Sequence, residues 1–470
     1  MWELGKILFV FITTVFFTGY LFYRYLVNHK IEKEGIFLIF ITGIIFYYLL
    51  ILLQIPLGLL IVYSKIISVF AIFFVLYHHS KTYKTFTLKK EYLLSVGILT
   101  VTFLYFTKSL LKSIMYQPIT GWDARSIWYF RAKQLFFNNG FSQTLGICSE
   151  GCTTSFSHAT YPFLLPSISA FICFDQGIWN EYLPKSNLLV LFSGLLLALI
   201  SLKHLHVLFK IGFILIIISI NPIQLTSGYQ DSWLGIYAAL SILFLCEFIR
   251  VKRREYLYTY LSCSILMCYI KNEGALLAIC IMVAFGTMLL LSKNQRLLRY
   301  SLLRTWKIKY LLVLLLLPFI LWTFYKAKFH YFDIDYNFNV LLNPQLWKQF
   351  FISEKYFMIH EFVIQQSNYI KIYISGVLVI ALSVISILIR KNNRQYLQEA
   401  MMIMAIPLIT SILFYLGLCI VYYSSLIDLD WHLSTSADRL REHLIYMSIV
   451  TFLYALYLIR LRLKIEIFEY

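Results

Sequence analysis

Five short polar motifs interrupt an otherwise apolar chain and carry the side chains that could do chemistry. They are Gly121-Trp122-Asp123-Ala124-Arg125, the segment from His158 through Tyr161 to Pro162, Gly228-Tyr229-Gln230-Asp231, Lys271-Asn272-Glu273-Gly274, and Asp438-Arg439 with His443. A carboxylate next to an apolar span, such as Asp123, costs free energy unless it has a partner or a task. One possible task is general-base catalysis, in which Asp123 takes a proton from a hydroxyl group.

The acidic motifs have structural interpretations as well. Tryptophan and basic residues around Asp123 are typical of an amphipathic helix at a membrane surface. Asp231 stands at the entry to an apolar span, where it could cap a helix N-terminus. Alternatively, Asp231 and Glu273 are further acidic groups that bind the acceptor, the donor or a metal.

The basic motifs are equally open. Lys271 could neutralise Glu273 across a very short turn, or hold a phosphate as a point charge. Arg439 could belong to a simple charge pattern at a helix start, or bind a phosphate through two hydrogen bonds while Asp438 orients it. His158 could be an ordinary structural residue, or contact a phosphate or sugar.

The composition restricts the class of protein that these motifs can serve. Of 470 residues, 60% are hydrophobic and only 14% are charged, against about a quarter in soluble domains. A soluble protein is therefore excluded. The net charge of +18 does not indicate nucleic-acid binding, because lysine and arginine fall mainly in short clusters between apolar spans. A Walker loop, a nucleotide-binding glycine-rich turn and a zinc-protease motif are all missing.

Long apolar segments predict an all-α, polytopic membrane protein with about thirteen transmembrane helices. The predicted spans are Ile7–Val27, Ile36–Leu53, Leu57–Tyr77, Tyr92–Leu111, Asn187–Ser201, Val207–Ile220, Ser232–Ile249, Tyr256–Ile270, Ala275–Leu291, Tyr310–Phe324, Tyr369–Ile389, Ala400–Tyr422 and His443–Ile459. Lys65 lies inside the third span and is expected to reach toward the interface.

Basic clusters predict the orientation of these spans. If the spans alternate, all six clusters lie on one side, which the positive-inside bias identifies as cytoplasmic. The five polar motifs then share the opposite, external side. This requires that the apolar segment Tyr161–Phe174 does not cross, and its length suits a re-entrant or interfacial helix better than a full crossing. Cys148 and Cys152 in the first external loop are candidates for a disulfide if that side is oxidising.

The five motifs, in their order and spacing from Trp122 to His443, resemble the membrane glycosyltransferases of the GT-C superfamily. The resemblance is to the bacterial branch similar to dolichyl-phosphate-mannose-type protein mannosyltransferases and lipid-modifying sugar transferases. It implies that Asp123 is the catalytic base and that Asp231 matches a second acidic residue. It also implies a polyprenyl-phosphate sugar as donor, with Arg439 and Lys271 as candidates to hold its phosphate.

His158 is a third candidate to bind the donor phosphate. Several further residues are expected to support this site: Trp122, Arg125, Tyr161, Tyr229, Asn272, Asp438 and His443. No cofactor is assigned. A divalent metal, with Asp123 and Asp231 as its only candidate ligands, is doubtful because Asp231 lacks an adjacent carboxylate. The expected partners are membrane lipids, the lipid-linked donor and an acceptor that is a glycan, a lipid or a protein. The expected location is the bacterial inner membrane, with the site facing the periplasm.

The resemblance divides the chain into four parts. Residues 1–91 form three N-terminal helices that the family does not usually have before its catalytic loop, and residues 92–325 form the GT-C-like core, with the external loop 112–186. Residues 326–368 form a second external loop, and 369–470 the C-terminal helices. Two other functions stay open: a secondary transporter, which would need ionisable groups near the bilayer midplane, and a ligase or polymerase of lipid-linked glycans.

Overall fold

The chain is an all-helical membrane protein in its described parts. A computed structural model describes residues 2–27, 35–82, 90–146, 158–291, 308–331, 352–362 and 394–463, and every regular element in these ranges is a helix. The elements are α1 (Trp2–Phe22), η1 (Tyr23–Val27), α2 (Ile36–Leu52), α3 (Leu57–Thr82), α4 (Lys90–Tyr116), η3 (Ala124–Tyr129), α5 (Phe130–Phe137), α6 (Leu164–Gln176), η5 (Leu183–Ser186), α7 (Asn187–Ser201), α8 (Val207–Ile220), α9 (Gln224–Ser227), α10 (Asp231–Val251), α11 (Arg254–Ile270), α12 (Asn272–Leu291), α14 (Lys309–Lys328), α16 (Glu354–His360), α18 (Arg394–Tyr423) and α19 (Leu429–Leu463).

Eight segments of the described chain are long and apolar enough to cross a membrane. They are Trp2–Val27, Leu57–Val75, Leu93–Tyr116, Leu183–Ser201, Asp231–Val251, Asn272–Leu291, Lys309–Lys328 and Glu399–Tyr423. Twelve of the thirteen predicted spans fall on helices, and the remaining one, Tyr369–Ile389, lies outside the described residues. The predicted spans are therefore largely confirmed as helices. Only eight segments of the described residues, however, are long and apolar enough to count as candidate spans.

Helix α10 forms the centre of the bundle. Its buried residues run without interruption from Asp231 to Ile249, and it packs against α11, α19, α18 and α12. A helix that is apolar on all sides is typical of such a fully enclosed position. Its first residue, Asp231, therefore lies within protein rather than against lipid.

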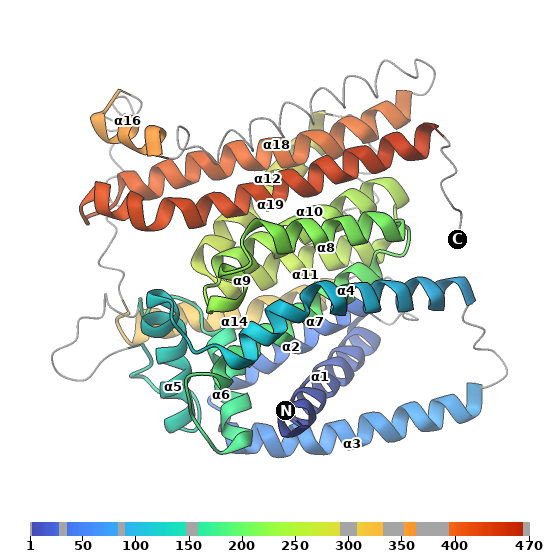
Figure 1. Ribbon diagram of the computed structural model, residues 1–470, viewed down its shortest axis with the longest axis vertical. Coiled ribbons are helices and arrows are strands. Elements are labelled where there is room, and N and C mark those ends of the chain that lie inside the picture. Colours follow the sequence, from blue (N-terminus) through green and yellow to red (C-terminus); the bar gives the residue numbers. More distant parts are fainter. Residues whose placement is uncertain are drawn as a thin grey trace.

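The two ends of α10 and α11 differ in charge. Asp231 begins α10 and Lys271 follows the last residue of α11, whereas the basic segment 250–254 joins the other ends of these two helices. Figure 1 shows α5 and α6 together on the left of the view, and α10 and α19 begin on this same side. The elements of the first polar loop thus gather at the end of the bundle that carries Asp231 and Lys271.

The short apolar segment predicted over Tyr161–Phe174 corresponds to α6 and is only 13 residues long. All residues from Leu164 to Cys173 are buried, and α6 packs against α5, η5, α1 and α3. Asp175, near its C-terminal end, accepts a hydrogen bond from Lys65 of α3 at 2.6 Å. This ion pair provides the partner that a lysine on the third span requires.

Helices α1 and α2 cross at two glycines. A Cβ atom on Gly43 would lie 1.9 Å from the carbonyl oxygen of Val15, and one on Gly19 would lie 2.0 Å from that of Ile39. Each helix therefore packs directly against the backbone of the other, as small residues permit at close helix crossings in membranes.

We expect Gly43→Ala to destabilise the protein, because the added methyl group forces α1 and α2 apart. Overpacking of this kind costs about 1–3 kcal/mol, which thermal unfolding of the purified protein in detergent would detect. Gly97→Ala on α4 is the matched control, since a Cβ there meets nothing within 4 Å. Equal melting temperatures for the two variants would contradict the close crossing.

Candidate active site

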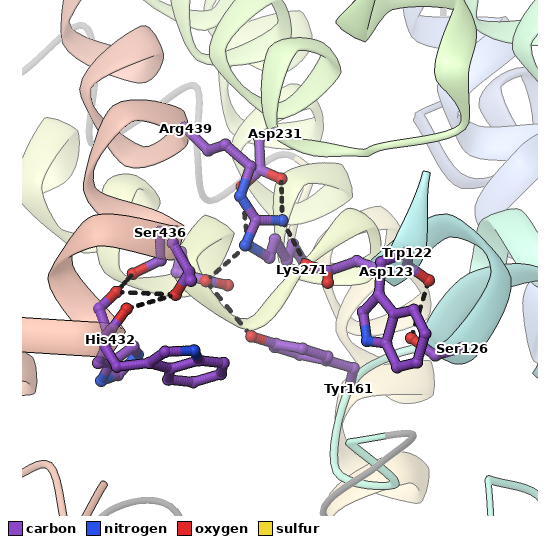
Figure 2. Close-up of polar contacts among 12 residues, drawn as sticks. Trp122, Asp123, Ser126, Tyr161, Asp231, Lys271, His432, Ser436 and Arg439 are labelled. Atoms are coloured by element: carbon purple, nitrogen blue, oxygen red, sulfur yellow. Dashed lines mark hydrogen bonds and ion pairs between the residues drawn. The ribbon is translucent and has the colours of Figure 1, made fainter. Parts of the chain in front are cut away.

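Four parts of the chain that are far apart in sequence meet in one cluster of charged side chains. Asp123 comes from the start of η3, Asp231 from the start of α10, Lys271 from the junction of α11 and α12, and Arg439 from α19. Figure 2 shows these side chains pointing toward one another, with Tyr161 and Trp122 beside them. The structure thus brings together the residues that the sequence analysis proposed as base, second acid and phosphate ligands.

The charges alternate in sign along the cluster. Arg439 Nη1 donates to Asp123 Oδ2 and lies 3.8 Å from Asp231 Oδ2. Lys271 Nζ donates to Asp231 Oδ1 at 2.7 Å and lies 2.8 Å from Glu273 Oε1. Three carboxylates therefore enclose two cations, and the cluster carries one net negative charge when all five groups are ionised.

Burial separates the cluster into an inner and an outer pair. The side chains of Asp231 and Lys271 are 2% and 9% exposed, whereas those of Asp123 and Arg439 are 25% and 18% exposed. Burial by itself would lower the pKa of Lys271, but the carboxylates of Asp231 and Glu273 outweigh it and hold that pKa above its ordinary value. Lys271 is therefore a permanent cation at neutral pH.

Aromatic rings complete the walls around both cations. The Arg439 guanidinium lies over the ring of Tyr229 at 5.2 Å, and Lys271 Nζ lies 5.7 Å from the ring centroid of Tyr161. Tyr161 also stacks on Trp128 with centroids 5.4 Å apart, and its hydroxyl lies 3.5 Å from Glu273 Oε1. Cation–π contacts of this kind favour a fixed position of each cation even when a carboxylate partner moves.

Two glycines allow the first loop to dock against the start of α10. A Cβ on Gly121 would lie 2.5 Å from Tyr229 Cε2, and one on Gly228 would lie 2.4 Å from Tyr129 Cε2. Gly228 also adopts a φ of 98°, which strains any residue with a side chain. The glycines of two motifs that are far apart in sequence therefore serve one contact.

Arg131 has a different role from the one expected of a basic residue in an interfacial helix. It is completely buried on α5, where Nη2 donates to the carbonyl oxygens of Ala159 and Tyr161 at 2.9 and 2.6 Å. Nη1 donates to the carbonyl oxygen of Pro162 at 3.3 Å. Burial lowers the pKa of Arg131 to about 10. Arg131 thus ties the helix that follows Asp123 to the segment that positions Tyr161.

The proposed partner of Arg439 needs a correction. Asp438 does not orient Arg439: it pairs with Arg441, one turn further along α19, and its side chain is 67% exposed. The reason is helical geometry, since neighbouring residues on a helix point in different directions and residues three apart share a face. Arg439 is oriented instead by Asp123 and Asp231 from other elements.

The remaining predicted residues differ in burial and in their contacts. His158 has its ring 5.3 Å from that of Tyr161 and a φ of 43°. His443 is completely buried, with its ring 5.7 Å from that of Phe414. Trp122 and Arg125 are exposed, and Asn272 is the first residue of α12. Cys148 and Cys152, the disulfide candidates, lie outside the described residues.

One wall of the site was not fully anticipated from the sequence. Figure 2 places His432 and Ser436 of α19 on the side opposite Trp122. Ser436 Oγ and the Tyr422 hydroxyl are 2.7 Å apart, and His432 Nδ1 lies 3.0 Å from Ser425 Oγ. His432, Ser436, Arg439 and His443 follow helical spacing. A prediction that began the last helix at Leu429 rather than His443 would have placed them on one face.

Within the described ranges, no group of three or more histidine, cysteine, aspartate or glutamate residues is arranged to hold a metal ion. The carboxylates of the cluster instead face Arg439 and Lys271. A hollow of about 340 Å³ also lies among the described residues, and none of the predicted site residues lines it. Its lining residues are Gln54, Phe141, Ser142, Gln143, Lys328 and Phe329.

No family model, no curated protein and no solved structure matches this chain. The features of this chain that bear on its function are therefore the cluster itself, its position at the end of the membrane helices and the chemistry of its five charged groups.

We expect Asp231→Asn to lower stability, because it deprives the buried Lys271 of one carboxylate. Removing one partner of a buried ion pair costs about 3–5 kcal/mol, and since Glu273 remains we expect roughly 2–4 kcal/mol in denaturant or thermal unfolding. The double variant Asp231→Asn/Lys271→Gln removes both charges, so its loss should be smaller than the sum of the single losses. Additive losses would show that the two side chains do not stabilise each other.

Proposed function

We propose that the protein is a membrane glycosyltransferase of the GT-C type, which transfers a sugar from a polyprenyl-phosphate donor to an acceptor hydroxyl with inversion. The observation that supports it best is the contact of Arg439 with Asp123 at the end of a membrane bundle. A candidate base and a candidate phosphate ligand lie within one hydrogen bond of each other there, beside a second cation, Lys271. Transfer with inversion needs the base and the phosphate on opposite faces of the anomeric carbon, so the sugar of a bound donor would lie between Asp123 and Arg439.

The reaction would be a direct displacement. Asp123 takes the proton of the acceptor hydroxyl while that oxygen attacks the anomeric carbon. The bond between this carbon and the phosphate oxygen breaks, and the lipid phosphate leaves with both electrons and one additional negative charge. Arg439 and Lys271 would stabilise that charge as it develops. The acceptor, whether glycan, lipid or protein, and the identity of the sugar are not specified by these residues.

The setting of the site is compatible with a lipid-linked donor. Trp122, next to Asp123, is 68% exposed, and Trp431 at the start of α19 is 58% exposed. Exposed tryptophans at the ends of apolar helices are typical of the membrane–water interface. The positive-inside bias makes this end of the bundle external. The proposed location is therefore the bacterial inner membrane, with the site facing the periplasm. In this proposal the chain crosses the membrane about thirteen times.

A secondary transporter is less well supported. Transporter sites depend on ionisable groups near the bilayer midplane, at interruptions within helices. Here Asp231 and Lys271 lie at helix ends, and Lys65 is paired with Asp175. A ligase or polymerase of lipid-linked glycans shares the donor chemistry and stays the closer alternative.

The test is turnover of purified protein with polyprenyl-phosphate sugars and membrane-derived acceptors. We expect Asp123→Asn to lower kcat about 10²- to 10⁴-fold, the usual contribution of a general base. The control is Asp430→Asn, an equal change of charge at an exposed position on α19, which should keep the wild-type rate. Full activity of a folded Asp123→Asn variant would exclude Asp123 as the base.

A further inference from the structure

Every charged group of the cluster already has a partner within the cluster. Arg439 faces two carboxylates, and Lys271 faces two carboxylates. A phosphate that binds Arg439 Nη1 or Lys271 Nζ must therefore compete with a carboxylate of the protein for that cation. Asp123 is constrained as well, because inversion places the acceptor hydroxyl on the face of the sugar opposite the phosphate, and Asp123 cannot contact Arg439 and that hydroxyl at the same time.

Burial and pairing decide which carboxylate can leave. Asp231 is 2% exposed, contacts both Lys271 and Arg439, and begins the enclosed helix α10. Displacing it would leave a charge in the protein interior without a partner, which is very costly. Asp123 is 25% exposed, contacts one cation, and lies at the N-terminal end of the short helix η3 rather than on a membrane-spanning helix.

Arg439 would keep its position if Asp123 moved away. Its guanidinium lies over the ring of Tyr229 and within 3.8 Å of Asp231 Oδ2. These two contacts come from the segment 229–231, which ends at the buried first residue of α10. A phosphate that arrives at Nη1 therefore meets a fixed guanidinium, and the exchange replaces one anion on Arg439 by another.

We propose that the Asp123–Arg439 ion pair is an exchangeable latch, which the phosphate of an amphiphilic donor opens by taking the place of Asp123 on Arg439. The released Asp123 is then free to act as the base, while Asp231 is a positioning residue that holds Lys271 and Arg439 throughout. No covalent bond changes in this exchange. The inference rests on the proposed function, and it adds that the donor must bind before Asp123 can accept the proton of the acceptor.

The latch makes an unusual prediction for binding: removing the carboxylate of Asp123 should strengthen the binding of a phosphate. The probe is decyl phosphate, titrated into the purified full-length protein in detergent. We expect Asp123→Asn to lower its Kd about tenfold, because the phosphate then no longer competes with a charged hydrogen-bond acceptor for Arg439; a factor of ten corresponds to about 1.4 kcal/mol. Asp123→Ser, which also removes the carboxylate, should lower the Kd in the same way. When Arg439→Gln is present, neither change of Asp123 should tighten the binding of decyl phosphate.

Two controls separate the latch from general electrostatics. Asp430→Asn changes the net charge equally, on the same helix as Arg439, and should leave the Kd for decyl phosphate unchanged. Inorganic phosphate should bind much more weakly than decyl phosphate to every variant, and equal affinity would exclude an amphiphilic ligand. An unchanged or higher Kd in Asp123→Asn and Asp123→Ser, or equal tightening in Asp430→Asn, would overturn the latch.

Measurements of binding and of turnover test the latch and the proposed function separately. If Asp123→Asn binds decyl phosphate more tightly but transfers sugar at the wild-type rate, the latch holds and the role of Asp123 as base fails. If the same variant loses turnover without tighter binding, the base assignment holds and the latch fails.

Discussion

The contact between Lys271 and Asp231 is the constraint on which the site depends. An ammonium group that is 9% exposed in the interior of a membrane protein is tolerated only with a close anionic partner. The Asp231 carboxylate meets this requirement at 2.7 Å and thereby joins the first residue of α10 to the end of α11. Because Arg439 lies near the other oxygen of Asp231, the same carboxylate also fixes the position of α19 relative to both helices.

Close backbone packing brings the other residues of the site to this contact. Gly121 and Gly228 allow the first loop to approach the start of α10 closely, which brings Asp123 within reach of Arg439. Arg131 holds the segment 159–162 through three of its carbonyl oxygens, and this segment carries Tyr161, whose ring lies near Lys271. A buried guanidinium bound to neutral carbonyls is a costly arrangement. The three hydrogen bonds of Arg131 offset part of this cost.

The proposed chemistry is an exchange of anions on Arg439. A cluster with three carboxylates and two cations is nearly neutral without a ligand, so no cation has to lie unpaired in the membrane protein. A phosphate is well suited to replace the outermost carboxylate, because it accepts the same charge-assisted hydrogen bonds from a guanidinium. The gradient of exposure, from Asp231 to Asp123, gives the exchange a direction.

The amino-acid sequence alone determined the membrane class, the positions of most helices and the placement of the polar motifs at one end of them, because hydropathy and basic clusters are local properties of composition. It also identified Asp123, Asp231, Lys271 and Arg439 as chemically unusual. Only the tertiary structure decided which charge pairs with which: Arg439 with Asp123, 316 residues earlier, rather than with its neighbour Asp438. Arg131 likewise turned inward to three carbonyl groups. Such pairings depend on how distant helices pack, and sequence spacing does not contain that information.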